Sequence, residues 1–147
     1  MQLETERLIL RPFRQTDLDA YAALNSDPDV MRYYPSPYTR EQSQASIDRC
    51  TASWERHGYG FSAVTNRDGG FLGLCGLSLY QSDQSFTPVV EIGWRFATSA
   101  WGRGLASEAA KAWLKFGFHT IGLEEIVAFT AIPNRPSQKV MERIGMT

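Results

Sequence analysis

The residues VVEIGWRFATSAWGRGLASEAA, numbers 89–110, predict a strand, a glycine turn and the start of a helix in one stretch. The first eight have the β-branched and aromatic density of a buried strand, and Glu91 and Arg95 interrupt it on one face. Gly102 and Gly104 follow, and their missing Cβ atoms free the backbone of a turn. An apolar stripe at helical spacing comes next. It consists of Leu105, Ala109, Trp113 and Phe116.

A strand, a turn with two glycines and a helix together predict an anion cradle. The first N–H groups of a helix have no partner within it, and the helix dipole is positive at that end. Glycines let a phosphate approach the backbone closely. The spacing differs from G-x-G-x-x-G of dinucleotide-binding folds and from G-x-x-x-x-G-K-[ST] of the P-loop. The sequence therefore predicts a third kind of phosphate cradle.

The segment WGRGLA, residues 101–106, which follows EIGW, resembles the signature of the GNAT superfamily of acyl-CoA N-acyltransferases. In that family a Q/R-x-x-G-x-G/A loop holds the pyrophosphate of acetyl-CoA. Gly104 and Ala106 take the last two motif positions, whereas Trp101 stands where the family often has Gln or Arg, which weakens one side-chain contact. The resemblance implies acetyl-CoA as co-substrate, no metal, and a set of cofactor-binding residues. These are Trp94, Phe96, Trp101, Gly102, Arg103, Gly104, Leu105, Ala106, Ser107 and Asn134.

Two further blocks extend the resemblance over nearly the whole chain. TERLILRPFRQTDLDAY at 5–21 and LEEIVAFTAIPNRPSQKVMERIGM at 123–146 are similar to the branch that contains the ribosomal-protein N-terminal acetyltransferases. Three ordered blocks are more specific than one glycine pair, so we expect a single acyl-CoA N-acyltransferase domain over residues 1–147.

The composition is typical of one globular domain, with 147 residues, 43% hydrophobic and 21% charged. Fifteen Lys and Arg against 16 Asp and Glu give a net charge of −1, so no broad basic face predicts binding to nucleic acid or an anionic membrane. No apolar run approaches the roughly 20 residues of a membrane span, and no secretory pattern opens the chain. We expect a cytoplasmic protein. Cys50 and Cys75 lack metal-type spacing and are expected to be reduced, buried thiols.

The expected elements are a strand, two helices, three strands, a helix, a strand and a helix. Strands are expected at 8–10, 59–65, 71–80, 89–96 and 126–130. Thr16 is a candidate cap for the first helix, and Thr39 with Gln42 forms a capping box for the second. This order predicts an α+β (α/β) sandwich with helices on both sides of a mixed, mainly antiparallel sheet. The resemblance implies a splay between the fourth and fifth strands that admits the pantetheine arm, with backbone groups of Trp94 and Phe96 binding it.

The chemistry of acetyl transfer needs a base, a polarised carbonyl and an acid. Glu91 on the fourth strand could take the amine proton, directly or through water, and its alternative reading is a solvent-facing carboxylate. A backbone N–H near Gly93 or Trp94 could polarise the carbonyl. Ser137 matches a hydroxyl position that could protonate the thiolate, and Asn134 matches a pantetheine contact. Both could equally cap the helix that begins near them.

Two further groups of side chains have open readings. Tyr33, Tyr34 and Tyr38 stand in a loop stiffened by prolines and could line a substrate pocket or fill a gap in the core. His119 shares one helix stripe, opposite the apolar side, with Glu108, Lys111 and Lys115, so it is expected to be solvated.

The sequence favours an enzyme that transfers acetyl from acetyl-CoA to a primary amine, either a protein or peptide N-terminal α-amine or a small-molecule amine. A non-catalytic acyl-CoA-binding or regulatory module is the alternative, and it would need the cradle without Glu91 or Ser137. The resemblance also implies a further strand pair beyond Met146, which this sequence does not contain. The strand at 126–130 would then present an open edge, so we expect self-association to a homo-oligomer.

Overall fold

The computed structural model describes residues 2–80, 89–128 and 135–145, and their core is one mixed sheet. The strands lie in the order β1-β2-β3-β4-β5-β6, and neighbours are antiparallel except β5 and β6, which are parallel. Their bounds are β1 Leu3–Glu4, β2 Leu8–Arg11, β3 Phe61–Asn66, β4 Phe71–Tyr80, β5 Val89–Phe96 and β6 Val127–Ala128. The predicted fold class, an α/β sandwich with a mainly antiparallel mixed sheet, is confirmed.

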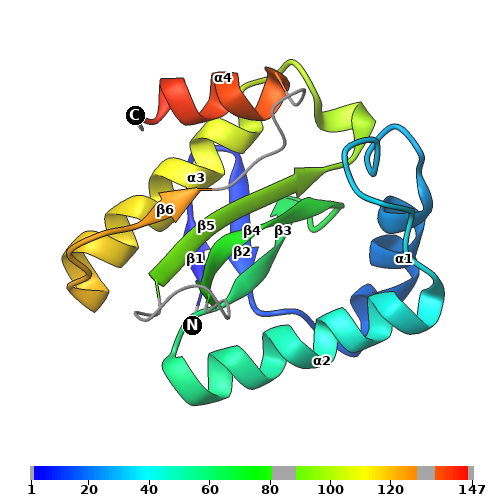
Figure 1. The fold of residues 1–147 in the computed structure, drawn as a ribbon, viewed down its shortest axis with the longest axis horizontal. Helices are drawn as coiled ribbons and strands as arrows, with labels where there is room; N and C mark the ends of the chain where they lie inside the picture. Colours follow the sequence, from blue (N-terminus) through cyan, green and yellow to red (C-terminus); the bar gives the residue numbers. More distant parts are fainter. Residues whose placement is uncertain (1, 81–88, 129–134, 146–147) are drawn as a thin grey trace.

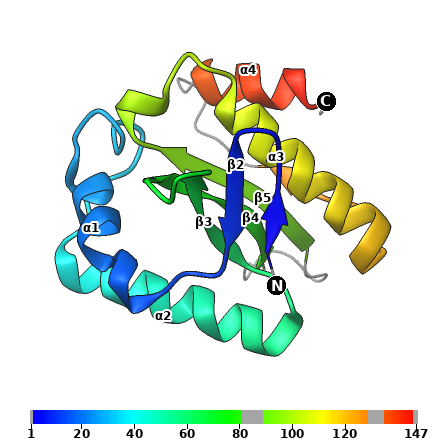
Figure 2. The ribbon, with the colours of Figure 1, turned by 180° about the vertical axis from the view of Figure 1, so that it is seen from behind.

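Helices cover both faces of this sheet (Figure 1). The helices α1 (Leu18–Ser26) and α2 (Arg40–His57) pack on one face, and α3 (Leu105–Lys115) packs on the other with α4 (Arg135–Arg143) beside it. The view from behind shows α3 running along the sheet, away from α1 and α2 (Figure 2). The sheet therefore separates two hydrophobic clusters.

The two clusters follow from the alternation of side chains along the strands. Leu77, Ile92 and Trp113 belong to the cluster under α3, and all three are almost completely buried. Tyr21 and Ile47 belong to the cluster under α1 and α2 and are equally buried. On β5, the apolar residues therefore face α3, whereas the polar face, with Glu91 and Arg95, turns toward α1 and α2.

Local signals placed α2 and the β3–β4 hairpin correctly. Thr39 and Gln42 form the predicted capping box, with Gln42 N donating to Thr39 Oγ1 at 3.1 Å and Thr39 N to Gln42 Oε1 at 2.8 Å. The helix ends at Gly58, whose φ of 75° is left-handed. Residues 66–70 join β3 to β4 as an antiparallel hairpin.

The prediction that Thr16 caps the first helix is wrong. A 3-10 turn over Gln15–Asp17 precedes α1, and the helix begins only at Leu18. Asp17 organises this turn, because its carboxylate accepts a hydrogen bond from the Arg14 N–H at 2.7 Å and two from the Arg11 guanidinium at 2.8 Å. Burial on its own would raise the pKa of Asp17. These hydrogen bonds outweigh burial, so the net pKa is lowered and the carboxylate stays ionised.

The ends of the sheet and of α3 also differ from expectation. The short strand β1 was not predicted, β3 begins at Phe61, and β6 begins at Val127. A π turn over Phe116–Ile121 continues α3 and ends at Gly122, whose φ is 84°. Gly117 lies in this turn against Ile126 and Leu77, and a Cβ there would lie 2.7 Å from the Ile126 side chain. The missing Cβ of Gly117 lets the helix end lie close to the sheet.

Strands β5 and β6 pair in parallel, with Glu91 opposite Val127 and Ile92 opposite Ala128. Beyond Ile92, β5 has no ladder partner on that side among the described residues, and residues 129–134 lie outside them. The predicted splay stays a prediction. In the part of the chain that the structure describes, no helix is long and apolar enough to span a membrane.

Candidate active site

The turn between β5 and α3 has the geometry of an anion cradle. Gly102 and Gly104 both have φ of 73°, and every other residue with positive φ in the described ranges is also a glycine. A Cβ at Gly102 would meet nothing within 4 Å, and at Gly104 the nearest atom is 3.7 Å away on Arg7. The left-handed backbone, rather than crowding, therefore requires glycine here. With these φ values the chain turns sharply into the first residue of α3, Leu105.

The first turn of α3 leaves N–H groups for a ligand. The N-cap residue is Gly104, no side chain caps the helix, and the Glu108 N–H makes the bond back to the Gly104 carbonyl at 3.1 Å. The N–H groups of residues 105–107 precede that bond and have no carbonyl to reach within the helix. The buried Ser107 hydroxyl also lacks a hydrogen-bond partner within the described ranges. These donors fit the pyrophosphate of an acyl-CoA.

A polar cluster from the start of the chain fixes this cradle. Arg7 Nη1 donates to the Arg103 carbonyl at 2.8 Å, and Arg7 Nε donates to Glu108 at 2.7 Å. The Arg7 N–H and the Thr5 hydroxyl also donate to Glu108. Burial on its own would raise the pKa of Glu108, but the bonds from Thr5 and Arg7 outweigh burial, so the net pKa is lowered. Glu108 therefore helps to position the cradle, whereas the sequence had placed it on a stripe facing solvent. The other members of that stripe are exposed, as expected; these are Lys111, Lys115 and His119.

Trp101 occupies its motif position in an unexpected way. Its indole Nε1–H donates to the Phe96 carbonyl at 2.9 Å, so this donor is used within the loop. The bond ties the turn to the end of β5, while the ring stays 52% exposed. Trp101 can therefore offer a cofactor its ring face but not the N–H donor that Gln or Arg would supply. The side chain of Arg103 is exposed and does not line the cavity described next.

A cavity of about 850 Å³ extends from the cradle along β5 to the loop between α1 and α2. Its size is that of a small-molecule site. It brings together most of the predicted site residues. These are Glu91, Trp94, Phe96, Trp101, Gly102, Gly104, Leu105, Ala106, Ser107, Ser137, Tyr33, Tyr34 and Tyr38. Asn134 lies outside the described residues.

The two predicted catalytic side chains line the same cavity from different elements. Glu91 lies in the middle of β5, opposite Ser78 of β4, and is partly buried. Burial raises the pKa of the Glu91 carboxyl, because removal from water disfavours its charged form. Ser137 is the third residue of α4 and is partly buried on the cavity wall. A carboxylate with a raised pKa is suited to accept a proton near neutral pH.

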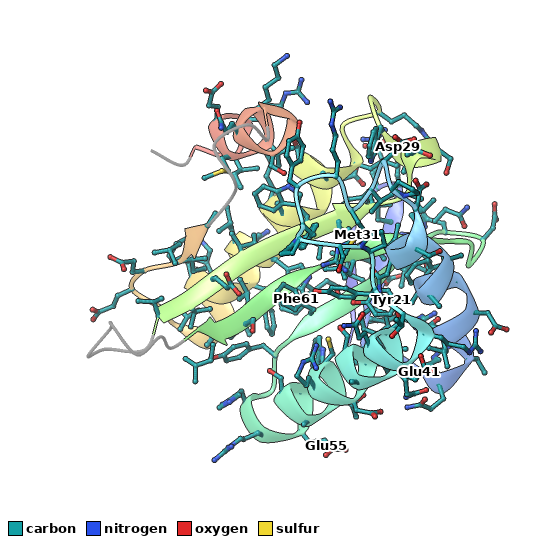
Figure 3. The ribbon with its side chains drawn as sticks, turned by 45° about the vertical axis from the view of Figure 1, so that its right-hand side comes forward. Tyr21, Asp29, Met31, Glu41, Glu55 and Phe61 are labelled. Carbon is teal, nitrogen blue, oxygen red and sulfur yellow. The ribbon has the colours of Figure 1, made fainter. Side chains whose placement is uncertain are left out.

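The tyrosine loop forms the far wall of this cavity, and none of its three rings belongs to either buried cluster. Figure 3 shows this loop, with Asp29 and Met31 labelled, lying over the C-terminal half of β5. Tyr34 and Tyr38 pack against each other, with ring centroids 6.4 Å apart, and both contact the guanidinium of Arg95. Tyr33 instead contacts Arg32. The loop thus surrounds a cation that sequence reasoning left without a role.

The two cysteines and the acidic residues form no metal centre in the described part of the chain. There, no group of three or more His, Cys, Asp or Glu side chains gathers where an ion could bind. Cys50 and Cys75 are free and buried, and burial raises the pKa of Cys50 to about 11 and that of Cys75 further still. Both thiols are therefore protonated near neutral pH.

The turn with the geometry of an anion cradle opens into a cavity lined by a partly buried carboxylate, an arrangement that suits an enzyme with a phosphate-bearing co-substrate. The model of the family "Acetyltransferase (GNAT) domain" matches residues 7–147, so the chain belongs to this family of acetyltransferases, which use acetyl-CoA. The cradle N–H groups and the unpartnered Ser107 hydroxyl fit that co-substrate.

Similar proteins agree with this assignment. The chain is 36% identical to the uncharacterized protein YkkB of Bacillus subtilis over 99% of this chain and 84% of the relative. It is 31% identical to the uncharacterized N-acetyltransferase YnaD of the same organism, over 99% and 82%. A crystal structure of an acetyltransferase from Agrobacterium tumefaciens superposes with a TM-score of 0.87 at 30% identity, covering 99% of this chain and 82% of that one.

A more distant structure has the same fold. It is a ribosomal L7/L12 alpha-N-protein acetyltransferase in complex with coenzyme A, with a TM-score of 0.81 over 99% of this chain and 83% of that chain. At 15% identity this likeness shows the fold alone.

Proposed function

We propose that this acetyltransferase transfers the acetyl group of acetyl-CoA to a primary amine, and that the amine attacks the thioester directly while both substrates are bound. The observation that carries the proposal is the position of Glu91. Its carboxyl lies on the cavity wall between the cradle and the tyrosine loop, and burial raises its pKa. A proton acceptor of this kind is what an amine acceptor needs at neutral pH.

Each step is assigned to a group of this chain. Glu91 takes a proton from the ammonium form of the acceptor, directly or through one water. The freed nitrogen forms the new C–N bond, while a backbone N–H near Gly93 or Trp94 stabilises the oxygen that becomes negative. The C–S bond then breaks, and the Ser137 hydroxyl gives its proton to the departing thiolate. The nitrogen releases its second proton to solvent and Ser137 recovers its own from there, while Glu91 gives up to solvent the proton that it took.

The acceptor class that we favour is the N-terminal α-amine of a protein or peptide, with small-molecule amines as the second class. An α-amine with a pKa of about 8 costs about 1 kcal/mol to deprotonate at pH 7, whereas a Lys amine near 10.4 costs about 4 to 5 kcal/mol. One carboxylate suffices for the former. The resemblance of residues 5–21 and 123–146 to the ribosomal-protein branch supports this choice.

Two measurements test the proposal. Calorimetry with acetyl-CoA measures binding to the cradle, and release of free coenzyme A thiol over a library of amines measures turnover. We expect both, with α-amines of peptides among the best acceptors. Binding without turnover over the whole library would instead support an acyl-CoA-binding regulatory module, and absence of binding would contradict both functions.

A further inference from the structure

Arg95 lies on the same face of β5 as Glu91 and lines the same cavity. The side chain is largely buried between the sheet and the tyrosine loop. A buried cation is costly unless it is paired, so its partners decide what it can do.

Among the described residues, the hydrogen bond and the ring contacts of the Arg95 side chain are with neutral groups. Nη1 donates to the Asn25 carbonyl oxygen at 2.7 Å, and the guanidinium carbon lies 4.7 Å from the Tyr34 ring centroid and 5.3 Å from that of Tyr38. Asn25 is fully buried, and its amide nitrogen donates to Ser43 at 3.0 Å, which turns its oxygen toward Arg95. The guanidinium is therefore held in place by an amide and two aromatic rings.

In the part of the chain that the structure describes, no carboxylate forms an ion pair with this guanidinium. Within residues 2–80, 89–128 and 135–145, the ion pairs at 4.0 Å or less are Arg7–Glu108, Arg11–Asp17, Arg40–Asp19 and Arg67–Glu4, so Arg95 has none. Its Nε is buried and has no hydrogen-bond partner among the described residues. Burial on its own would lower the pKa of Arg95. The oxygens of Tyr34, Tyr21 and Tyr38 together outweigh burial, so the net pKa is raised and the guanidinium stays charged.

A second cation strengthens the positive charge at this end of the cavity. Arg49 of α2 also lines it and is exposed, and it has no ion pair within the described ranges either. Arg49, Cys50 and Arg95 line the same cavity, and both arginines lower the pKa of the Cys50 thiol against the larger effect of burial. Asp29 and Glu91 line the cavity without pairing to either arginine.

We propose that Arg95 binds a carboxylate of the acceptor, so that the enzyme prefers amines that carry a carboxylate at a distance from the amine. The inference rests on the proposed function, because it takes Glu91 as the place of the reacting nitrogen. Charge-assisted bonds from a guanidinium to a carboxylate are the strong, oriented contacts that its planar donors favour. The carboxylate can come from a small amino acid or from an acidic side chain of a peptide.

The spacing along β5 limits the shape of this acceptor. Arg95 lies four residue steps after Glu91 along the strand, which is roughly 13 Å between their Cα atoms. The guanidinium is held toward Asn25 of α1 rather than toward Glu91. An α-amino acid, whose amine and carboxylate share one carbon, is too short to reach both groups. The acceptor is instead an ω-amino acid or a peptide with an acidic residue near its free N-terminus.

The test compares acceptors that differ only in one charge. Thiol release is measured with saturating acetyl-CoA for 6-aminohexanoate against 6-aminohexanamide, and for the peptide amide Ala-Ala-Asp against Ala-Ala-Asn. The two pairs distinguish a small-molecule from a peptide source. We expect kcat/KM for the acid to exceed that for the amide by about 10- to 100-fold in at least one pair, since bonds to a charged group have that strength.

Variants assign the preference to Arg95. In Arg95→Gln the ratio of acid to amide kcat/KM should fall to near one, and Arg95→Lys should retain part of it. Arg32→Gln is the matched control, because it removes the same charge from an exposed residue of the same region that does not line the cavity. That variant should keep the ratio of the unmodified enzyme. If Arg95→Gln fails to fold, Arg95→Lys and the unmodified enzyme still decide.

The outcomes separate this inference from the proposed function. Equal rates with acid and amide in both pairs, or an acid preference that Arg95→Gln and Arg95→Lys leave intact, overturn the role of Arg95 while the acetyltransferase function stands. If no amine is acetylated, the proposed function fails. Carboxylate binding is then measured by thermal stabilisation with 6-acetamidohexanoate against its amide in the presence of coenzyme A, and equal stabilisation overturns the inference.

Discussion

Burial of the Glu91 carboxyl raises its pKa, so the carboxylate that we propose as proton acceptor is protonated at a higher pH than an exposed glutamate would be. We expect kcat/KM to fall as pH decreases through this raised pKa. Glu91→Gln should remove that dependence and lower kcat by about 10²- to 10⁴-fold, which is the usual contribution of a general base. Initial rates across a pH series measure both effects.

The same shift gives a stability check with the opposite sign. A carboxyl whose pKa is raised on folding binds its proton more tightly in the native state, so it destabilises the protein as pH rises from the unfolded toward the folded pKa and above it. Glu91→Gln should therefore unfold at a temperature no lower than the unmodified protein at pH 7. Glu55→Gln makes the same change on an exposed residue of α2 and is the control. It should alter neither the unfolding temperature nor the turnover. Undiminished turnover in Glu91→Gln would make this residue a structural carboxylate.

Gly104 offers a second test at the level of one residue. Its left-handed φ of 73° admits other residues only with strain, and a Glu there would place bulk and negative charge against the pyrophosphate. Gly104→Glu should reduce the affinity for acetyl-CoA below detection by calorimetry. Gly58→Glu is closely matched, because Gly58 has φ of 75°, open space around its Cβ position and no place in the cavity wall. It should lose comparable stability and keep the affinity. Equal binding losses in both variants would trace the effect to strain.

At the scale of elements, the cradle depends on a contact between parts of the chain about 100 positions apart. Arg7 joins the start of β2 to Glu108 in the first turn of α3 and to the Arg103 carbonyl between the two glycines. Arg7→Ala should free the turn and weaken acetyl-CoA binding. Loss of two charge-assisted bonds at a partly exposed site predicts a decrease of about tenfold. Calorimetry measures it.

The control for this prediction is another exposed ion pair. Arg40→Ala breaks the contact of Arg40 with Asp19, in which both side chains are more than half exposed. Such pairs contribute little, so neither stability nor acetyl-CoA affinity should change measurably. If Arg7→Ala binds acetyl-CoA as tightly as Arg40→Ala does, the turn holds its shape through its glycines and the Trp101 bond alone.

The same contrast explains which elements the sequence could predict. The α2 caps, the β3–β4 hairpin and the glycine turn depend on residues a few positions apart, and local signals identified them. The Arg7–Glu108 contact and the pairing of β1 with β2 depend on tertiary packing, which no local pattern encodes. Thr16 failed as a cap because Asp17 competes for the same turn.

The candidate site shows the same limit. The residues of one motif are predictable as a group, and the structure places nearly all of them on one cavity. Two hydrogen bonds of the site could not be predicted. The Trp101 indole N–H donates to the Phe96 carbonyl and the Arg95 guanidinium donates to Asn25, and both bonds depend on which groups folding brings together. The catalytic roles of Glu91 and Ser137 are likewise predictions, and Glu91→Gln tests the first of them.

For the whole molecule, the sheet order leaves β6 at one end. It pairs with β5 on one side, and no other described strand lies on its outer side. Its two described residues, Val127 and Ala128, are half-buried. A strand edge with open N–H and C=O groups is a template for another chain, and each such group costs about 1 to 3 kcal/mol when buried without a partner.

We therefore expect the 147-residue chain to self-associate through the β6 edge or the adjoining end of the cavity. Light scattering over a range of protein concentrations should show a mass above that of a monomer at tens of micromolar. Val127→Lys places a charge on this edge, which natural sheets use to prevent pairing, and should shift the mass toward the monomer. Leu79→Lys is the control, because Leu79 is 43% exposed on β4, whose two edges are already paired. A monomer with a cooperative thermal transition at all concentrations would show that the chain covers this edge itself.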